Sequence, residues 1–142
     1  MNEISKQYAV DLTRLKTAVY RATNSAGASI DFGSGEGLFS PVELLLAAVA
    51  GCSAVDVDVV TSRRAEPKAF DVHVEGDRVN EDGASRLSEV RVGFDLSFPD
   101  TPEGNQARKL VDNLVRISHE KDCTVSRTVE NPTRVLFSND SK

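Results

Sequence analysis

An α+β fold of a single domain, residues 1–142, is predicted by two observations. Alternating apolar and polar residues, typical of half-buried strands, run through residues 70–79 and 89–98, whereas apolar residues at helical spacing mark two separate helices. A chain of 142 residues with 39% hydrophobic and 27% charged residues is also long enough to bury a core without disulfides or metals. We expect the element order β-β-β-α-β-β-α-β.

The first part of the chain predicts strands. The segments "YAVDL" (8–12) and "KTAVYRATN" (16–24) are rich in β-branched and aromatic residues, and a turn at residues 25–27 separates them from a third segment, "ASIDF" (28–32). The glycine-rich residues 33–37 lack the Lys-Ser/Thr ending of a phosphate-binding loop. We therefore interpret them as a simple loop.

The first helix is predicted to run from Pro41 to about Arg63. Ser40 is suited to cap it, Pro41 fits its first position, and Glu43 completes a capping box. The first half of this helix is apolar on every side, which is typical of a helix surrounded by protein. One sheet covers a helix on one side only, so we infer a homodimer in which a second copy supplies the remaining cover.

The second half of the chain predicts a hairpin followed by a helix. The strands "FDVHVEGDRV" and "EVRVGFDLSF" are joined by a loop at residues 80–83. A helix start at residues 101–103 leads into a buried face marked by Leu110, Leu114 and Ile117, with the helix end near His119. One or two further turns in "CTVSRTV" and a last strand in "TRVLFS" complete the order.

The charge and the lengths of the apolar segments argue against nucleic-acid binding, secretion and membrane insertion. The net charge is −5, and the Lys and Arg residues are dispersed, which argues against nucleic acid. A secretory signal has a basic region followed by an apolar one, and the N-terminus shows no such pattern. The uncharged apolar stretch from Leu44 to Val55 is too short to cross a membrane. We expect a cytoplasmic protein.

The two cysteines, Cys52 and Cys123, have different surroundings. Cys52 shares an apolar helix face with Leu44, Ala48 and Val55. A free cysteine at such a position commonly packs in the core as a small hydrophobic residue. Cys123 is expected at the start of a short helix, close to unpaired backbone N–H groups and to Lys121 and Arg127, which lower a thiol pKa. Local electrostatics alone therefore favour Cys123 as the reactive thiol.

For the other candidate site residues, the sequence gives less indication of a functional role. Glu43 and Cys52 fall on opposite faces of the helix, so capping explains Glu43 better than a role beside the thiol. The two histidines, His73 and His119, and the two cysteines show no ligand spacing, and we expect no metal.

The segments "SPVELLLAAVAGCSAVDV" and "CTVSRTV" together resemble the two signatures of the OsmC/Ohr family, named for osmotically inducible protein C and organic hydroperoxide resistance protein. The resemblance covers nearly the whole chain. It implies an OsmC-like intertwined homodimer in which extended antiparallel sheets wrap two long central helices. It also implies a peroxidase that reduces organic hydroperoxides, with Cys52 as the peroxidatic residue and Cys123 as the resolving one. The implied reductant is an external dithiol such as a lipoyl protein or thioredoxin, and no cofactor is expected.

Two further residues enter through this resemblance. In the hydroperoxide resistance branch an arginine and a glutamate hold the reactive thiolate; Arg21 is the best match for the arginine here, followed by Arg14. Val42 occupies the glutamate position, with Glu43 one residue later. This departure motivates an alternative, a non-enzymatic dimer that binds a small apolar ligand or senses stress through its thiols. A third hypothesis is a structural stress protein with both thiols inert.

Overall fold

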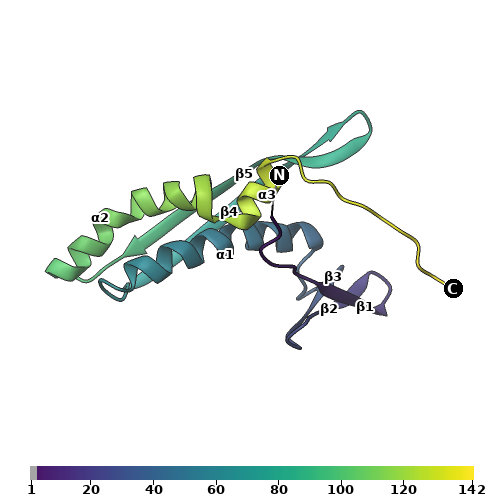
Figure 1. The fold of residues 1–142 in the computed structure, drawn as a ribbon, viewed down its shortest axis with the longest axis horizontal. Helices are drawn as coiled ribbons and strands as arrows, with labels where there is room; N and C mark the ends of the chain where they lie inside the picture. Colours follow the sequence, from purple (N-terminus) through teal and green to yellow (C-terminus); the bar gives the residue numbers. More distant parts are fainter. Residues whose placement is uncertain (1–2) are drawn as a thin grey trace. The chain divides into compact units, whose positions relative to one another are not determined.

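The computed structural model describes residues 3–142, and its elements confirm the α+β class. Three strands come first, β1 (Val10–Lys16), β2 (Val19–Asn24) and β3 (Ser29–Gly33), and helix α1 (Pro41–Thr61) follows (Figure 1). The remaining elements are β4 (Ala69–Glu81), β5 (Ala84–Ser97), α2 (Pro102–Ile117), the π-helical turn η1 (Ser118–Asp122) and α3 (Thr124–Glu130).

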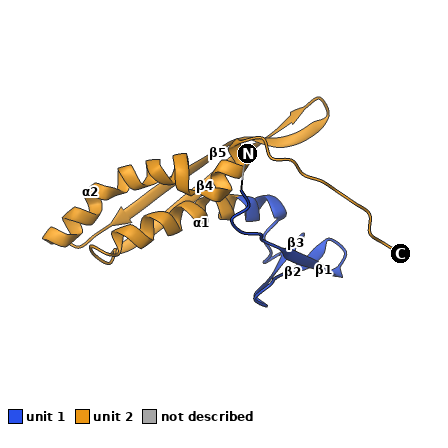
Figure 2. Ribbon diagram, viewed as in Figure 1, with its two compact units in different colours: residues 1–45 blue, residues 46–142 orange. Residues whose placement is uncertain are grey.

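The chain divides into two compact units, residues 1–45 and residues 46–142 (Figure 2). The boundary falls within α1, so its capped start belongs to the first unit and the turn that carries Cys52 belongs to the second. We describe each unit by itself. The organisation of the chain as one domain stays a prediction.

The first unit contains an antiparallel sheet of order β1-β2-β3. The predicted segment 16–24 is not one strand, because Lys16 ends β1 opposite Val19 and Ala18 takes a positive φ of 61° in the turn between them. Strand β1 also begins at Val10, later than predicted. The turn at residues 25–27 is confirmed: the Asn24 side-chain oxygen accepts hydrogen bonds from the backbone N–H groups of Ala26 and Ala28, both at 3.0 Å.

The start of α1 confirms the predicted capping box. Ser40 Oγ accepts a hydrogen bond from the Glu43 N–H at 3.2 Å, and Glu43 Oε1 accepts one from the Ser40 N–H at 2.8 Å. Two backbone donors that the helix itself leaves unpaired are thereby satisfied. The helix ends at Thr61, close to the predicted Arg63.

The hairpin β4-β5 is confirmed, with a tighter turn than predicted. Glu81 pairs with Ala84, so Asp82 and Gly83 alone form the turn, and both have positive φ angles, 51° and 83°. An Asp-Gly pair suits this conformation because glycine accepts positive φ without strain. The aromatic rings of Phe70 and Phe94 pack edge to face on the half-buried side of the hairpin, with centroids 6.4 Å apart.

Helix α1 approaches the hairpin closely at Gly76. A Cβ added to Gly76 would lie 3.3 Å from the Leu46 side chain of α1 and 3.3 Å from the Glu89 carbonyl oxygen of β5. The absence of a side chain at this position therefore lets the helix and the hairpin pack together.

The start of α2 is also as predicted, because Thr101 Oγ1 accepts a hydrogen bond from the Gly104 N–H at 3.0 Å. The α-helix ends at Ile117 and continues as a π-helical turn, so helical backbone extends to Asp122, beyond the predicted end near His119. The predicted inner face, Leu110, Leu114 and Ile117, is half-buried.

The predicted last strand is wrong. Residues 132–142 form no regular secondary structure, and the Val135, Leu136 and Phe137 side chains are 69%, 76% and 93% exposed. The segment has β-forming composition, but strand formation depends on pairing with a neighbouring strand. Within residues 3–142 it finds none.

Helix α1 carries much unburied apolar surface. Across residues 3–142 it is the one helix whose length and composition would suffice to cross a membrane, although the core helix of a soluble protein meets the same criteria. Val55 and Val59 are each more than half exposed. Asp56 and Asp58 interrupt this surface, and the Asp56 carboxylate accepts a hydrogen bond from Ser118 within the same unit. The second half of α1 is therefore held by a polar contact to another part of the same unit.

Candidate active site

The second unit brings the two cysteines together. Cys52 lies on α1 and Cys123 caps the start of α3; both are free thiols, near enough for each to shift the pKa of the other. Cys52 is half-buried, whereas Cys123 has no exposed surface. Two neighbouring free thiols, one of them only half-buried, form a pair that can be oxidised to a disulfide when their sulfurs meet.

The π-helical turn η1 positions Cys123. Its closing bond runs from the Cys123 N–H to the Ser118 carbonyl oxygen at 2.7 Å, five residues back. The Ser118 hydroxyl, itself buried, donates a hydrogen bond to Asp56 Oδ2 at 2.7 Å. Because Asp56 lies one helical turn after Cys52 on α1, this bond ties the turn that ends at Cys123 to the helix that carries Cys52.

Helix α3 is held against the same turn. The Arg127 guanidinium donates to the Glu120 carbonyl oxygen at 3.1 Å, and His119 Nε2 lies 2.6 Å from Glu130 Oε1. The first contact satisfies a carbonyl left free at the end of a helix, and the second joins η1 to the last residue of α3.

Hydrogen bonds favour the ionised form of Cys123. Burial raises the pKa of the Cys123 thiol, but bonds from the Ser126 hydroxyl at 3.0 Å and the Ser126 N–H at 3.3 Å, with further bonds from Ser53 and Cys52, outweigh burial. The pKa of Cys123 therefore lies below its usual value. This agrees with the sequence-based expectation that Cys123 is the more acidic thiol; the Ser126 N–H is one of the predicted backbone donors, whereas the Ser126 hydroxyl was not predicted.

The surroundings of Cys52 act in the opposite direction. Burial raises the pKa of the Cys52 thiol most, and a hydrogen bond from the Val125 N–H only partly offsets it. The neighbouring Cys123 sulfur and the negative charge of Asp56 raise it further. The more accessible sulfur is thus the more weakly acidic one.

Replacing Asp56 with asparagine should lower the pKa of Cys52. The amide removes the negative charge and keeps an oxygen that accepts the Ser118 hydrogen bond, so Cys52 should be alkylated faster at neutral pH. Peptide mapping after timed treatment with iodoacetamide across a pH series measures this rate for Cys52. The control is Asp58→Asn, which removes an equal charge two residues along α1 where the carboxylate bonds to Ser62. Equal rates in the Asp56→Asn protein and the wild type would contradict the assignment.

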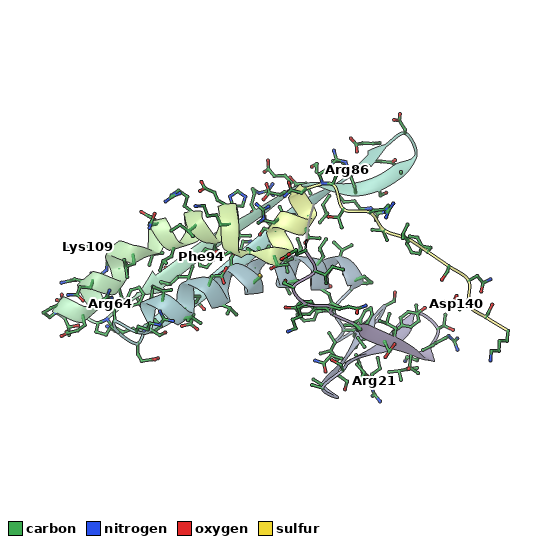
Figure 3. All side chains as sticks on the ribbon, in the orientation of Figure 1. Arg21, Arg64, Arg86, Phe94, Lys109 and Asp140 are labelled. Carbon is green, nitrogen blue, oxygen red and sulfur yellow. The ribbon has the colours of Figure 1, made fainter. Side chains whose placement is uncertain are left out.

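The other two predicted site residues are engaged in contacts within the first unit. Arg21 lies on β2 in the first unit (Figure 3). It makes a two-pronged ion pair with Asp31 on β3, at 2.8 and 3.0 Å. The Glu43 carboxylate accepts the Ser40 hydrogen bond of the capping box, which lowers its pKa. These contacts support the capping interpretation of Glu43. The role of Arg21 or Glu43 beside the thiols stays a prediction.

Sequence reasoning missed the polar residues that surround the cysteine pair. Ser126 lies three residues after Cys123, a spacing that places its N–H and hydroxyl at a capping side chain, so this contact has a sequence signal. Ser53 gave no such signal, and the Asp56–Ser118 bond joins residues from distant parts of the chain.

A groove of about 230 Å³ lies between α1 and α2, beginning one helical turn beyond Cys52. Its lining is mostly aliphatic and includes two carboxylates, with Val55, Asp56, Val59, Val60, Leu114, Ile117 and Asp122 around it. Across residues 3–142, no three His, Cys, Asp or Glu side chains are grouped as a metal site requires.

Solved structures show where the fold recurs. A hypothetical protein from Aquifex aeolicus aligns with a TM-score of 0.70 at 25% identity, covering 88% of each chain. An OsmC-like protein of unknown function from Vibrio cholerae aligns with a TM-score of 0.71 at 15% identity, covering 88% of this chain and 94% of that one. The organic hydroperoxide resistance protein OhrB of Bacillus subtilis aligns with a TM-score of 0.52 at 18% identity, covering 87% and 90%.

Sequence comparison gives the family. No curated protein matches the chain significantly. The family described as OsmC-like protein matches residues 33–137, which include α1 with Cys52 and the segment from Cys123 through α3. The resemblance in the two cysteine-containing segments is thereby confirmed, and the chain belongs to the OsmC-like family.

Proposed function

We propose that the protein is a thiol-dependent peroxidase that reduces organic hydroperoxides. The observation that carries this proposal is that the half-buried Cys52 and the buried Cys123, both free thiols, lie near enough to shift each other's pKa. The OsmC-like family match and the neighbours named for hydroperoxide resistance support the same reaction class. The aliphatic groove beside the turn of Cys52 favours a peroxide with an organic group.

The chemistry proceeds in two steps. The Cys52 sulfur attacks one peroxide oxygen, the O–O bond breaks, and an alcohol leaves while Cys52 becomes a sulfenic acid. The Cys123 sulfur then attacks the Cys52 sulfur, a disulfide forms, and the sulfenic oxygen leaves as water. Because the second thiol lies nearby, its attack competes with overoxidation of Cys52 to the sulfinic acid. An external dithiol, such as a lipoyl protein or thioredoxin, would restore both thiols.

A homodimer is part of the proposal. Isolated, the chain leaves the apolar side chains of Val55 and Val59 on α1 and of the Val135–Phe137 segment exposed, and contiguous exposed apolar surface marks interaction sites. A second copy packed along α1 would cover it. We place the protein in the cytoplasm, where reduced thiols persist.

The test is intact-mass analysis of the reduced protein after one equivalent of cumene hydroperoxide. We expect a loss of two hydrogens within one chain, mapped by peptide analysis to a bond between Cys52 and Cys123. The same protein kept without peroxide is the control. An unchanged mass with both thiols free would contradict the proposal and leave the structural hypothesis.

A thiol-based stress sensor is the second candidate. The raised pKa of Cys52 and the presence of Val42 where the family's hydroperoxide resistance branch has a glutamate both favour slow oxidation. A sensor would form the disulfide once per chain. A peroxidase would consume many equivalents of peroxide when excess dithiothreitol is present.

A further inference from the structure

The segment formed by η1 and α3, which carries Cys123, has several hydrogen bonds within itself. The Cys123 N–H donates to the Ser118 carbonyl oxygen at 2.7 Å, and the Ser126 hydroxyl and N–H donate to the Cys123 sulfur at 3.0 and 3.3 Å. The Arg127 guanidinium donates to the Glu120 carbonyl oxygen at 3.1 Å. These bonds fix the shape of the segment, but they do not fix its distance from α1.

A hydrogen bond between Ser118 and Asp56 reaches from this segment to the helix that carries Cys52. The Ser118 hydroxyl donates to Asp56 Oδ2 at 2.7 Å and joins residues 62 positions apart in the chain. Ser118 is 1% exposed, and a hydrogen bond to a carboxylate is stronger than one between neutral groups. Because Asp56 follows Cys52 by one helical turn, the bond attaches the segment to α1 close to that cysteine.

Apolar packing gives less support at this place. The groove of about 230 Å³ between α1 and α2 has Asp56 in its lining together with Ile117, the residue before Ser118. Val55 and Val59 on the α1 side of the groove are each more than half exposed. Because side chains do not fill the space between the helices here, the polar bond beside the groove matters more for the distance between α1 and the segment.

We propose that Ser118 and Asp56 are positioning residues that hold Cys123 within reach of Cys52 for disulfide formation. This inference rests on the proposed peroxidase function, in which Cys123 resolves the Cys52 sulfenic acid. In that step the Cys123 sulfur bonds to the Cys52 sulfur, the S–O bond breaks, and the sulfenic hydroxyl leaves as water with the proton of the Cys123 thiol. Ser118 acts through the position of Cys123 and takes no part in these bond changes.

The position of Cys123 decides the fate of the sulfenic acid. When organic hydroperoxide is in excess, a second peroxide molecule transfers an oxygen to the sulfenic sulfur and leaves as the alcohol, which gives the sulfinic acid. The disulfide forms only where Cys123 attacks first. A misplacement of about 1 Å can slow a reaction between two held groups about a hundredfold. Loss of the Asp56–Ser118 bond should therefore slow disulfide formation without blocking the first oxidation of Cys52.

The main experiment measures the attack of Cys123 on Cys52 without peroxide, in Ser118→Ala and the wild type. Cys52, the half-buried thiol, attacks dithiobis(nitrobenzoate), releases one thionitrobenzoate and becomes a mixed disulfide. Cys123 then attacks the Cys52 sulfur and releases the second thionitrobenzoate as the protein disulfide forms. The absorbance of thionitrobenzoate follows both releases, and intact mass identifies the products.

The two releases separate a positioning role from a general loss of packing. We expect Ser118→Ala to slow the second release by about tenfold or more and to change the first by less than about threefold. A second release slowed by less than about tenfold would overturn the proposal. Equal slowing of both releases would assign the effect to general packing and would overturn it as well.

Ser62→Ala is the matched control. The Ser62 hydroxyl donates to Asp58 Oδ1 at 2.7 Å, so the substitution removes a bond of the same kind and length. That bond joins residues only four positions apart, at the end of α1, and does not reach the segment that carries Cys123. Ser62→Ala should release both thionitrobenzoates at the wild-type rates. Equal rates of the second release in Ser118→Ala and Ser62→Ala would contradict the positioning role.

Two variants of Asp56 cover the case in which Ser118→Ala fails to fold, which circular dichroism checks. Asp56→Asn and Asp56→Ala remove the same negative charge, but only asparagine keeps an oxygen that accepts the Ser118 hydrogen bond. The effect of the charge on the thiols is therefore common to both. The second release should be faster in Asp56→Asn than in Asp56→Ala by about tenfold or more. Equal rates in the two variants would overturn the proposal.

Excess cumene hydroperoxide tests the same bond in the proposed reaction. Intact mass distinguishes the disulfide, which has lost two hydrogens, from the sulfinic acid, which has gained two oxygens. Ser118→Ala should give a larger share of sulfinic acid than the wild type and Ser62→Ala, and an unchanged share would contradict the positioning role. A wild-type protein that peroxide does not oxidise would refute the proposed function, a result distinct from that of the thionitrobenzoate experiment.

Discussion

Substitution of Cys52 by serine should reduce peroxide consumption to the uncatalysed rate. A serine hydroxyl has no accessible sulfenic acid state, so neither the attack on the O–O bond nor the disulfide can follow. Consumption of cumene hydroperoxide in excess dithiothreitol measures the effect. Because Cys52 is half-buried and serine is of similar size, the variant should fold, which circular dichroism checks.

Ala54→Ser is the control for this experiment. It introduces a hydroxyl into the same helix two residues along, at another half-buried position, and leaves both sulfurs in place. It should retain peroxide consumption close to that of the wild type. Full activity in Cys52→Ser would refute the role of Cys52, and loss of activity in both variants would assign the effect to helix packing.

Gly104→Ala should destabilise the protein strongly. An added Cβ would lie 1.9 Å from the Pro99 carbonyl oxygen and 2.9 Å from its carbonyl carbon, and both are backbone atoms that cannot rotate away. Moving them disturbs the segment between the buried Phe98 and Thr101, the N-cap of α2. Overpacking of a core typically costs about 1–3 kcal/mol, and we expect a loss at the upper end of this range or beyond.

Urea denaturation, with the free energy of unfolding extrapolated to water, measures this loss. Gly93→Ala is the matched control, because Gly93 lies in β5 and an added Cβ would meet no atom within 4 Å. That substitution should leave stability unchanged or raise it by about 0.5–1 kcal/mol, since glycine weakens a strand interior. An unfolding free energy for Gly104→Ala equal to that of Gly93→Ala would contradict the predicted clash.

The elements that were predictable from sequence are those fixed by local physics. The capping box at Ser40 and Glu43 and the cap at Thr101 depend on residues three apart, and the alternation in the hairpin depends on residues two apart. The end of β1 at Lys16 was not predictable in this way. Positive φ angles usually occur at glycine, and here the residue with positive φ in the turn is Ala18. The segment at residues 133–138 has strand-forming residues, but only a neighbouring strand can make them a strand.

For the cysteine pair, too, only part of the environment was predictable from the sequence. Sequence chemistry indicated that Cys123 is the more acidic thiol, and the family resemblance indicated that Cys52 and Cys123 act together. The contacts that distinguish them, from Ser53 and Asp56 on α1 and from Ser118 on the π-helical turn, bring together residues far apart in the chain. Cys52 and Asp56 have a local i, i+4 spacing, but burial raises the pKa of Cys52 most, and burial depends on packing against distant residues, so this rise could not be foreseen.

The position of Cys123 depends on the number of residues in the π-helical turn before it as much as on which residues these are. The bond from Cys123 to Ser118 spans five residues, one more than an α-helix would use. Deleting a residue from this turn would remove the five-residue span that brings the Cys123 N–H to the Ser118 carbonyl oxygen, so Cys123 would lose the bond that positions it. The thiol would then leave its partner on α1. Substitutions that keep the Ser118 hydroxyl should be compatible with this segment, whereas insertions and deletions should not.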